Sequence, residues 1–139
     1  MSAAPPRATQ THRELALWME QNSDRLYLSV VTVAKIEDGI AKAAREGAGQ
    51  KVDLLAKWIE TLFHLYGARI LALDVATARL AGRLSDLARE RGHAPRFADL
   101  AIAATAQMHG YVVLTRNVRH FAVLDVAVHD PFIGLPSPQ

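Results

Sequence analysis

The stretch "RFADLAIAATAQMHGYVVLTRN", residues 96–117, predicts a helix followed directly by a strand. The helix has Asp99 at its start, is otherwise almost entirely apolar, and ends at Gly110. The run "YVVLT" that follows is apolar throughout, which is typical of a strand buried on both faces of a parallel sheet. Packing does not require a carboxylate in such a helix, so Asp99 is either a helix cap or a functional residue.

The same alternation of helix and strand extends along the chain on both sides of this stretch. Short apolar runs predict strands at residues 25–29, 69–73 and 126–130, and amphipathic spacing predicts helices at 11–21, 33–46, 51–67 and 75–92. Ser29 or Thr32 is the expected cap of the second helix, and Asp74 is the expected cap of the fourth. The third helix has an expected buried stripe of Leu54, Trp58, Leu62 and Leu65. The pattern indicates an α/β fold with a short, mainly parallel central sheet.

Composition indicates a packed domain without cysteine chemistry. Half of the 139 residues are apolar and the net charge is +2, so we expect one domain over residues 1–139 with a tail at 133–139. The absence of cysteine excludes zinc–thiolate sites, and no two histidines have the spacing that would let a helix pair them as ligands. No run of the sequence reads as a membrane span or a leader, so we expect a cytoplasmic protein with no membrane partner.

Asp99 and Asn117 are expected to lie at the same edge of the sheet. The helix runs antiparallel to the strand that follows it, so the start of the helix meets the carboxyl end of that strand, where Asn117 stands. The strand at residues 25–29 delivers "VTVAKIED" to this edge as well. Oxygen atoms gathered there predict a site for a hard cation, Mg²⁺ or Mn²⁺. Taken singly, Asp99 is ordinarily a cap and Asn117 a turn residue.

Three segments carry a resemblance to a known family. "YLSVVTVAKIEDGIAKA", "ADLAIAATAQMHGYVVLTRNVRHF" and "VAVHDPF" occur in this order between Trp18 and Phe132. Together they resemble the PIN-domain toxins of the VapC type, including the FitB-like branch. The resemblance implies a three-layer α/β/α sandwich that acts as a Mg²⁺- or Mn²⁺-dependent endoribonuclease. It also implies a cognate VapB- or FitA-like antitoxin, an RNA substrate and a homodimer.

The resemblance assigns site residues one position at a time. Asp99 matches the third acidic position of the family and is expected to be catalytic and to bind the metal. Asn117 matches the fourth position, which is Asp or Asn in the motif T-R-[DN]. The second position, Glu in the motif T-V-A-E, is Lys35 in this sequence. Asp38 shares the helix face of Lys35 and is the nearest substitute as a metal ligand, whereas Glu37 points away; both are otherwise solvated surface.

The first acidic position of the family has no counterpart. It lies in an N-terminal strand with the motif L-D-T-N-V, and this sequence contains no such segment. That strand is central in the family's sheet, so a chain without it would leave two inner edges unpaired. Three explanations stay open: the true start lies upstream of Met1, the gene has decayed, or a partner or second copy supplies the strand. The otherwise intact core pattern favours the first.

Basic residues flank the predicted edge. Arg96, Arg116 and Arg119 would hold RNA phosphates in a nuclease, or are solvated surface. His120 lacks a partner histidine, so no general-base role is expected.

The function that the resemblance implies is the toxin of a type II toxin–antitoxin system, weak or inactive because two acidic positions are missing. The alternative is a non-catalytic PIN-like module that dimerises and sequesters antitoxin.

Overall fold

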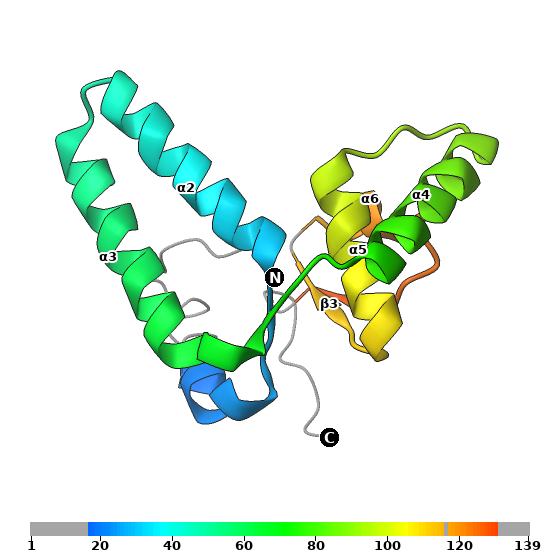
Figure 1. The fold of residues 1–139 in the computed structure, drawn as a ribbon, viewed down its shortest axis with the longest axis horizontal. Helices are drawn as coiled ribbons and strands as arrows, with labels where there is room; N and C mark the ends of the chain where they lie inside the picture. Colours follow the sequence, from blue (N-terminus) through cyan, green and yellow to red (C-terminus); the bar gives the residue numbers. More distant parts are fainter. Residues whose placement is uncertain (1–16, 116, 131–139) are drawn as a thin grey trace. The chain divides into compact units, whose positions relative to one another are not determined.

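The computed structural model describes residues 17–115 and 117–130 and divides the chain into two compact units (Figure 1). Among the described residues, 17–71 form the N-terminal unit, and 72–115 with 117–130 form the C-terminal unit. Both units combine helices with one pair of parallel strands, which confirms the predicted α/β class. None of the helices in the described ranges is long and apolar enough to cross a membrane.

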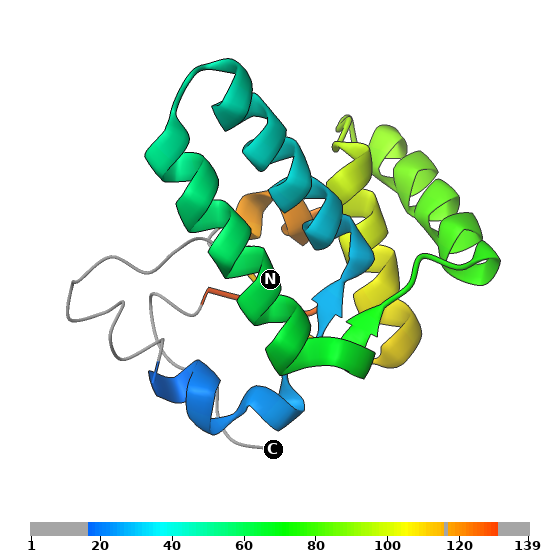
Figure 2. The same cartoon turned by 60° about the vertical axis from the view of Figure 1, so that its left-hand side comes forward.

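The N-terminal unit is built around a helical hairpin. Residues 17–21 are helical, and the predicted helix at 11–21 otherwise lies outside the described residues. The elements that follow are η1 (Ser23–Arg25), β1 (Leu28–Ser29), α2 (Val30–Arg45), α3 (Gly49–Tyr66), η2 (Gly67–Arg69) and β2 (Ile70–Leu71). Helices α2 and α3 pack side by side (Figures 1 and 2). Strand β1 pairs with β2 in parallel, which places Leu28 opposite Ile70.

Local signals set the ends of the hairpin helices. Ser29, rather than Thr32, caps α2, because its hydroxyl accepts a hydrogen bond of 3.1 Å from the backbone N–H of Val31. Helix α3 ends where Gly67 adopts a φ of 40°, a conformation that side chains other than glycine rarely adopt. The predicted helix boundaries in this unit are therefore confirmed to within a turn.

The predicted buried stripe of α3 is wrong in part. The buried residues of this helix are Ile59, Leu62 and Tyr66, whereas Leu54 and Leu65 are 55% and 49% exposed. A leucine-rich helix carries apolar side chains on two adjoining faces, so spacing alone does not select one of them.

The C-terminal unit contains α4 (Val75–Glu90), α5 (Phe97–His109), β3 (Val113–Leu114), α6 (Val118–Ala122) and β4 (Val128–His129). Asp74 caps α4 as predicted, because its carboxylate accepts a hydrogen bond of 2.8 Å from the backbone N–H of Thr77. Hydrogen bonds from Thr77 hold the pKa of Asp74 below its ordinary value. Strand β3 pairs with β4 in parallel, with Val113 opposite Val128.

Helix α5 forms the core of the C-terminal unit. All seven residues from Leu100 to Ala106 are buried, and the helix packs against α4 (Figure 1). Burial on all sides is expected of a helix that is apolar all round. Its small alanine side chains allow neighbouring elements to come close. This burial fixes the helix that carries Asp99 in its first turn.

Candidate functional site

Asp99 lies in the first turn of α5 without acting as its cap. The N-cap position belongs to Arg96, whose side chain makes no capping hydrogen bond. Asp99 is the third residue of the helix, and its side chain is only 15% exposed. Capping alone therefore does not explain a carboxylate at this position. The negative charge is nevertheless favourable near the start of a helix, where the backbone N–H groups point outward.

Asn117 stands at the start of α6, between β3 and that short helix. Its backbone N–H donates a hydrogen bond of 3.0 Å to the hydroxyl oxygen of the buried Thr115. Its own side chain makes no capping hydrogen bond. Asn117 is exposed and follows β3, so its polar side chain lies beyond the carboxyl end of that strand.

The partner that α6 brings to Asp99 is His120. The Nδ1 atom of His120 lies 3.6 Å from the Oδ2 atom of Asp99, within ion-pair distance but longer than a hydrogen bond. The backbone N–H of His120 donates a hydrogen bond of 3.0 Å to the carbonyl oxygen of Asn117, so Asn117 and His120 share one helical turn. The structure thus places Asp99, Asn117 and His120 in one region of the C-terminal unit. The sequence contains no spacing rule that links positions 99 and 120, which is why His120 was missed as a neighbour of Asp99.

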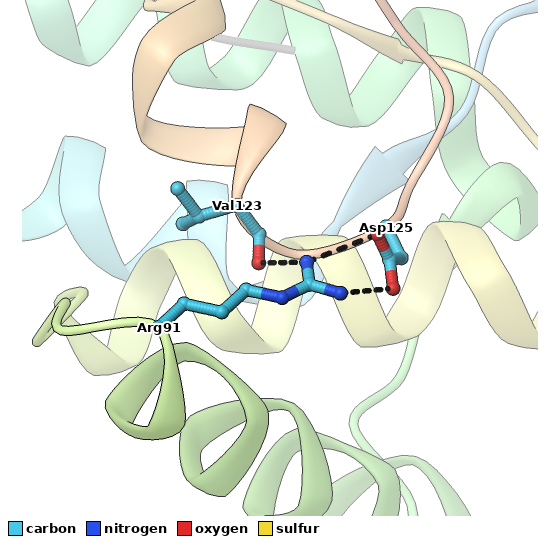
Figure 3. Close-up of polar contacts among 3 residues, drawn as sticks. All are labelled: Arg91, Val123 and Asp125. Carbon is cyan, nitrogen blue, oxygen red and sulfur yellow. Dashed lines mark hydrogen bonds and ion pairs between the residues drawn. The ribbon is translucent and has the colours of Figure 1, made fainter.

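A fork of hydrogen bonds from Arg91 holds the segment that follows α6 (Figure 3). The guanidinium donates to both carboxylate oxygens of Asp125, at 3.1 and 3.0 Å, and to the carbonyl oxygen of Val123 at 3.2 Å. Asp125 has a φ of 52°, in the left-handed region that aspartate tolerates better than most residues. The hydrogen bonds from Arg91 hold the pKa of Asp125 below its ordinary value. The fork links the C-terminal end of α4 to the turn after α6.

The remaining predicted site residues fall into three groups. Arg96 and Arg119 are exposed next to Asp99 and Asn117 in the sequence, as RNA contacts would require. Arg116 lies outside the described residues. Lys35 and Asp38 are both exposed on α2, in the N-terminal unit, so their roles stay predictions from the resemblance.

The donor atoms in the described region suit a hard cation only in part. Within residues 17–115 and 117–130, no three acidic or histidine side chains form a group that could hold a metal ion. Asp99 and Asn117 offer carboxylate and amide oxygens, which are the donors that Mg²⁺ and Mn²⁺ prefer. Mg²⁺ often keeps several waters and binds through one or two carboxylates together with substrate phosphates. These residues therefore fit an open, water-rich site rather than a closed protein cage.

Comparison with known proteins identifies the class. The sequence matches the PIN domain family over residues 4–126, and the chain belongs to this family. It is 31% identical over 129 residues to toxin FitB of Neisseria gonorrhoeae, an alignment that covers 91% of each chain. It is 30% identical over 122 residues to VapC ribonuclease Y4jK of Sinorhizobium fredii, covering 86% of this chain and 85% of the relative.

A solved structure agrees with this assignment. A chain in the crystal structure of FitAcB from Neisseria gonorrhoeae matches with a TM-score of 0.76 and 30% identity. The match covers 92% of this chain and 89% of the other. The predicted resemblance to FitB- and VapC-type PIN proteins and the predicted PIN-like α/β/α fold class are both confirmed.

Proposed function

We propose that this protein is the toxin of a type II toxin–antitoxin pair and cleaves RNA in the cytoplasm as a divalent-metal-dependent endoribonuclease. Its relatives named toxin FitB and VapC ribonuclease support the reaction class. The observation that carries the proposal is the placement of Asp99. This carboxylate is mostly buried in the first turn of a buried helix, does not occupy the N-cap position and lies 3.6 Å from His120 of α6.

Asp99 is the proposed metal ligand, and Asn117 assists through its amide oxygen or a bound water. Mg²⁺ or Mn²⁺ is the proposed ion, and Asp38 stays a predicted third ligand on the resemblance alone. When bound, such an ion supplies a more acidic water and neutralises charge that develops on the RNA phosphate. The protein's own contribution is to hold the oxygen donors on rigid elements and to bind the RNA backbone.

Arg96, Arg116 and Arg119 are the proposed contacts to RNA phosphates. Arginine suits this role because its planar guanidinium donates two hydrogen bonds to one phosphate. These contacts carry little sequence information, so they position the RNA rather than select it. Replacing one of them is expected to raise the KM for RNA more than it lowers kcat.

Lys35 limits the activity that we propose. It occupies the position of a family Glu, so an ammonium stands where the family places a carboxylate. A cation site needs net negative charge, and the loss of one ligand removes most of the affinity of such sites. We therefore expect weak cleavage that is measurable with Mn²⁺ and absent with a chelator.

The test of the proposal is RNA cleavage by the purified chain. Wild-type protein is incubated with RNA in Mn²⁺ and in chelator, beside Asp99→Asn and the control Asp86→Asn. Asp86 is an exposed acid on α4 whose nearest cation is Arg89 at 3.9 Å. We expect chelator-sensitive cleavage in wild type and Asp86→Asn, and none in Asp99→Asn. Equal cleavage in Asp99→Asn would remove Asp99 from the site.

Two observations favour a second function. Lys35 stands where the family has an acid, and no three acidic or histidine side chains among the described residues form a group that could hold a metal ion. In this alternative the chain is a non-catalytic PIN module that dimerises and sequesters a VapB- or FitA-like antitoxin. Co-expression with a VapB- or FitA-like antitoxin separates the two. We expect a stable complex of this chain with the antitoxin under both functions. Mn²⁺-dependent cleavage after removal of the antitoxin is expected only if the chain is a nuclease.

A further inference from the structure

We propose that His120 is a positioning residue that orients the Asp99 carboxylate for metal binding; this inference rests on the proposed nuclease function. His120 comes from α6 and Asp99 from α5, and both belong to the C-terminal unit. The Nδ1 atom of the imidazole lies 3.6 Å from Oδ2 of the carboxylate. Among the described residues, Asp99 has no other basic side chain within ion-pair distance.

The chemistry of the pair allows Asp99 to serve His120 and a metal at once. A carboxylate has two oxygens, and His120 approaches one of them, which leaves lone pairs of the other for a cation. Carboxylates that bind metals are commonly held by hydrogen bonds from a neighbouring group, which fixes their rotation. At 3.6 Å the contact is too long for a hydrogen bond, but such contacts often tighten when the ligands of a site are bound.

The segment that carries His120 is anchored on both sides of the residue. Phe121 of α6 is buried, and Leu124, two residues after the end of the helix, is fully buried, so the core holds the chain on the C-terminal side of His120. The Arg91 fork then holds the carbonyl of Val123 and the carboxylate of Asp125 immediately afterwards. His120 itself is 59% exposed, but it is attached to backbone that has little freedom. An anchored neighbour is what preorganisation of a site requires.

Two other roles for His120 make different predictions. As a surface ion pair of no functional consequence, it would leave metal binding unchanged on substitution. As a direct RNA contact, its loss would raise the KM for RNA and leave Mn²⁺ affinity unchanged. A positioning role predicts the opposite: weaker Mn²⁺ binding and lower kcat, with KM for RNA nearly unchanged.

The contact can be read without metal from the tautomer of His120. Neutral imidazole must carry its proton on Nδ1 to donate to Asp99. Long-range ¹H–¹⁵N spectra of metal-free protein at about pH 8, where an ordinary imidazole is neutral, report this tautomer. We expect the Nδ1–H form at His120 in wild type and a shift toward the Nε2–H form in Asp99→Ala, which removes the acceptor oxygen. His93, an exposed histidine of the same unit, should not respond.

The metal arm compares His120→Ala, His120→Gln and the matched control His93→Ala. Mn²⁺ affinity is measured by titration calorimetry, and kcat and KM are measured with RNA. We expect Mn²⁺ affinity and kcat to fall about tenfold in His120→Ala, the low end of what such supporting groups contribute. His120→Gln should recover part of the loss because its amide can donate to the same oxygen, and His93→Ala should match wild type.

The outcomes separate this inference from the proposed function. If wild type binds Mn²⁺ and cleaves RNA, but His120→Ala matches His93→Ala in Mn²⁺ affinity, the positioning role is overturned and the nuclease stands. If wild type neither binds Mn²⁺ nor cleaves RNA, both are overturned. A rise in KM alone in His120→Ala would overturn positioning in favour of RNA contact.

Discussion

At the scale of single residues, the candidate site depends on one carboxylate and the charges around it. Asp99 is held in the first turn of a buried helix, where a charged group is retained only if something compensates it. The Nδ1 atom of His120 lies 3.6 Å from this carboxylate, and a divalent cation is its proposed second neighbour. By the resemblance, Lys35 stands at an acidic position of the PIN pattern, where it would reverse the charge.

Replacing Lys35 with glutamate tests that departure. Lys35→Glu exchanges an ammonium for a carboxylate at the family position, so we expect Mn²⁺ to bind at least about tenfold more tightly. Cleavage of RNA should rise with it. Lys57→Glu makes the same change of net charge at an exposed position of α3 and should leave both properties unchanged. Equal Mn²⁺ titrations for wild type and Lys35→Glu would remove Lys35 from the site.

The Arg91–Asp125 pair makes a prediction about pH. Arg91 lowers the pKa of Asp125, so the folded state holds the charged carboxylate more strongly than the unfolded state does. The stabilisation is therefore present above the ordinary aspartate pKa of 3.8 and is lost as the pH falls through the lower folded value. Asp125→Asn should unfold at lower denaturant concentration at neutral pH and lose less stability on acidification. Asparagine also tolerates a positive φ, so backbone strain does not account for the difference.

An unchanged acid profile would contradict this role. Urea unfolding of wild type and Asp125→Asn at neutral and acidic pH gives the comparison, with Asp86→Asn as the control. Because both members of the Arg91–Asp125 pair are substantially exposed, the effect should be small and should shrink at high salt.

At the scale of elements, the sequence was sufficient where a helix boundary depends on a local group. Asp74 and Ser29 cap their helices through their own side chains, and Gly67 and Gly110 end theirs with positive φ values. These signals act within a few residues and need no knowledge of the fold. These capping and glycine signals, together with apolar spacing, predicted the type and the order of the helices in the described ranges.

Features that depend on distant neighbours were predicted less well. Apolar runs of five residues became paired strands of two residues, because a strand extends only as far as its partner pairs with it. The buried face of α3 was misassigned because the packing partner selects it. The contact of His120 with Asp99 depends on how α6 packs beside α5, and no sequence spacing encodes that.

The cap of α2 gives an element-scale prediction. Ser29 is buried and its hydroxyl satisfies the N–H of Val31, so Ser29→Ala should lower the free energy of unfolding by about 1 kcal/mol. Ser29→Thr keeps the hydroxyl and should cost less. Thr61→Ala, at an exposed position inside α3, should stay within about 0.5 kcal/mol of wild type. Urea unfolding measures all three, and a Ser29→Ala curve that overlays wild type would contradict the capping role.

At the scale of the whole molecule, each unit has its own helical pair and its own pair of parallel strands. The helix pair α2–α3 characterises the N-terminal unit, and α4–α5 characterises the C-terminal unit. Asp99, Asn117 and His120 all belong to the C-terminal unit, whereas Lys35 and Asp38 belong to the other.

Self-association is the prediction at this scale. Leu54 and Leu65 lie on one face of α3, because eleven residues make about three helical turns, and they are 55% and 49% exposed. We expect a solution mass of twice the 15.2 kDa of one chain by light scattering. Leu54→Lys with Leu65→Lys should return the mass to that of one chain, and His64→Lys should not. A wild-type mass of one chain at high concentration would contradict the dimer.

Mn²⁺ binding, measured by electron paramagnetic resonance, tests most directly whether Asp99 binds a divalent metal in a PIN nuclease. Free Mn²⁺ is titrated into the full chain, with Asp99→Asn and the control Asp86→Asn measured under the same conditions. The prediction is one Mn²⁺ site in wild type and in Asp86→Asn that is lost in Asp99→Asn. Mn²⁺ binding that persists undiminished in Asp99→Asn, or none in wild type, would contradict it.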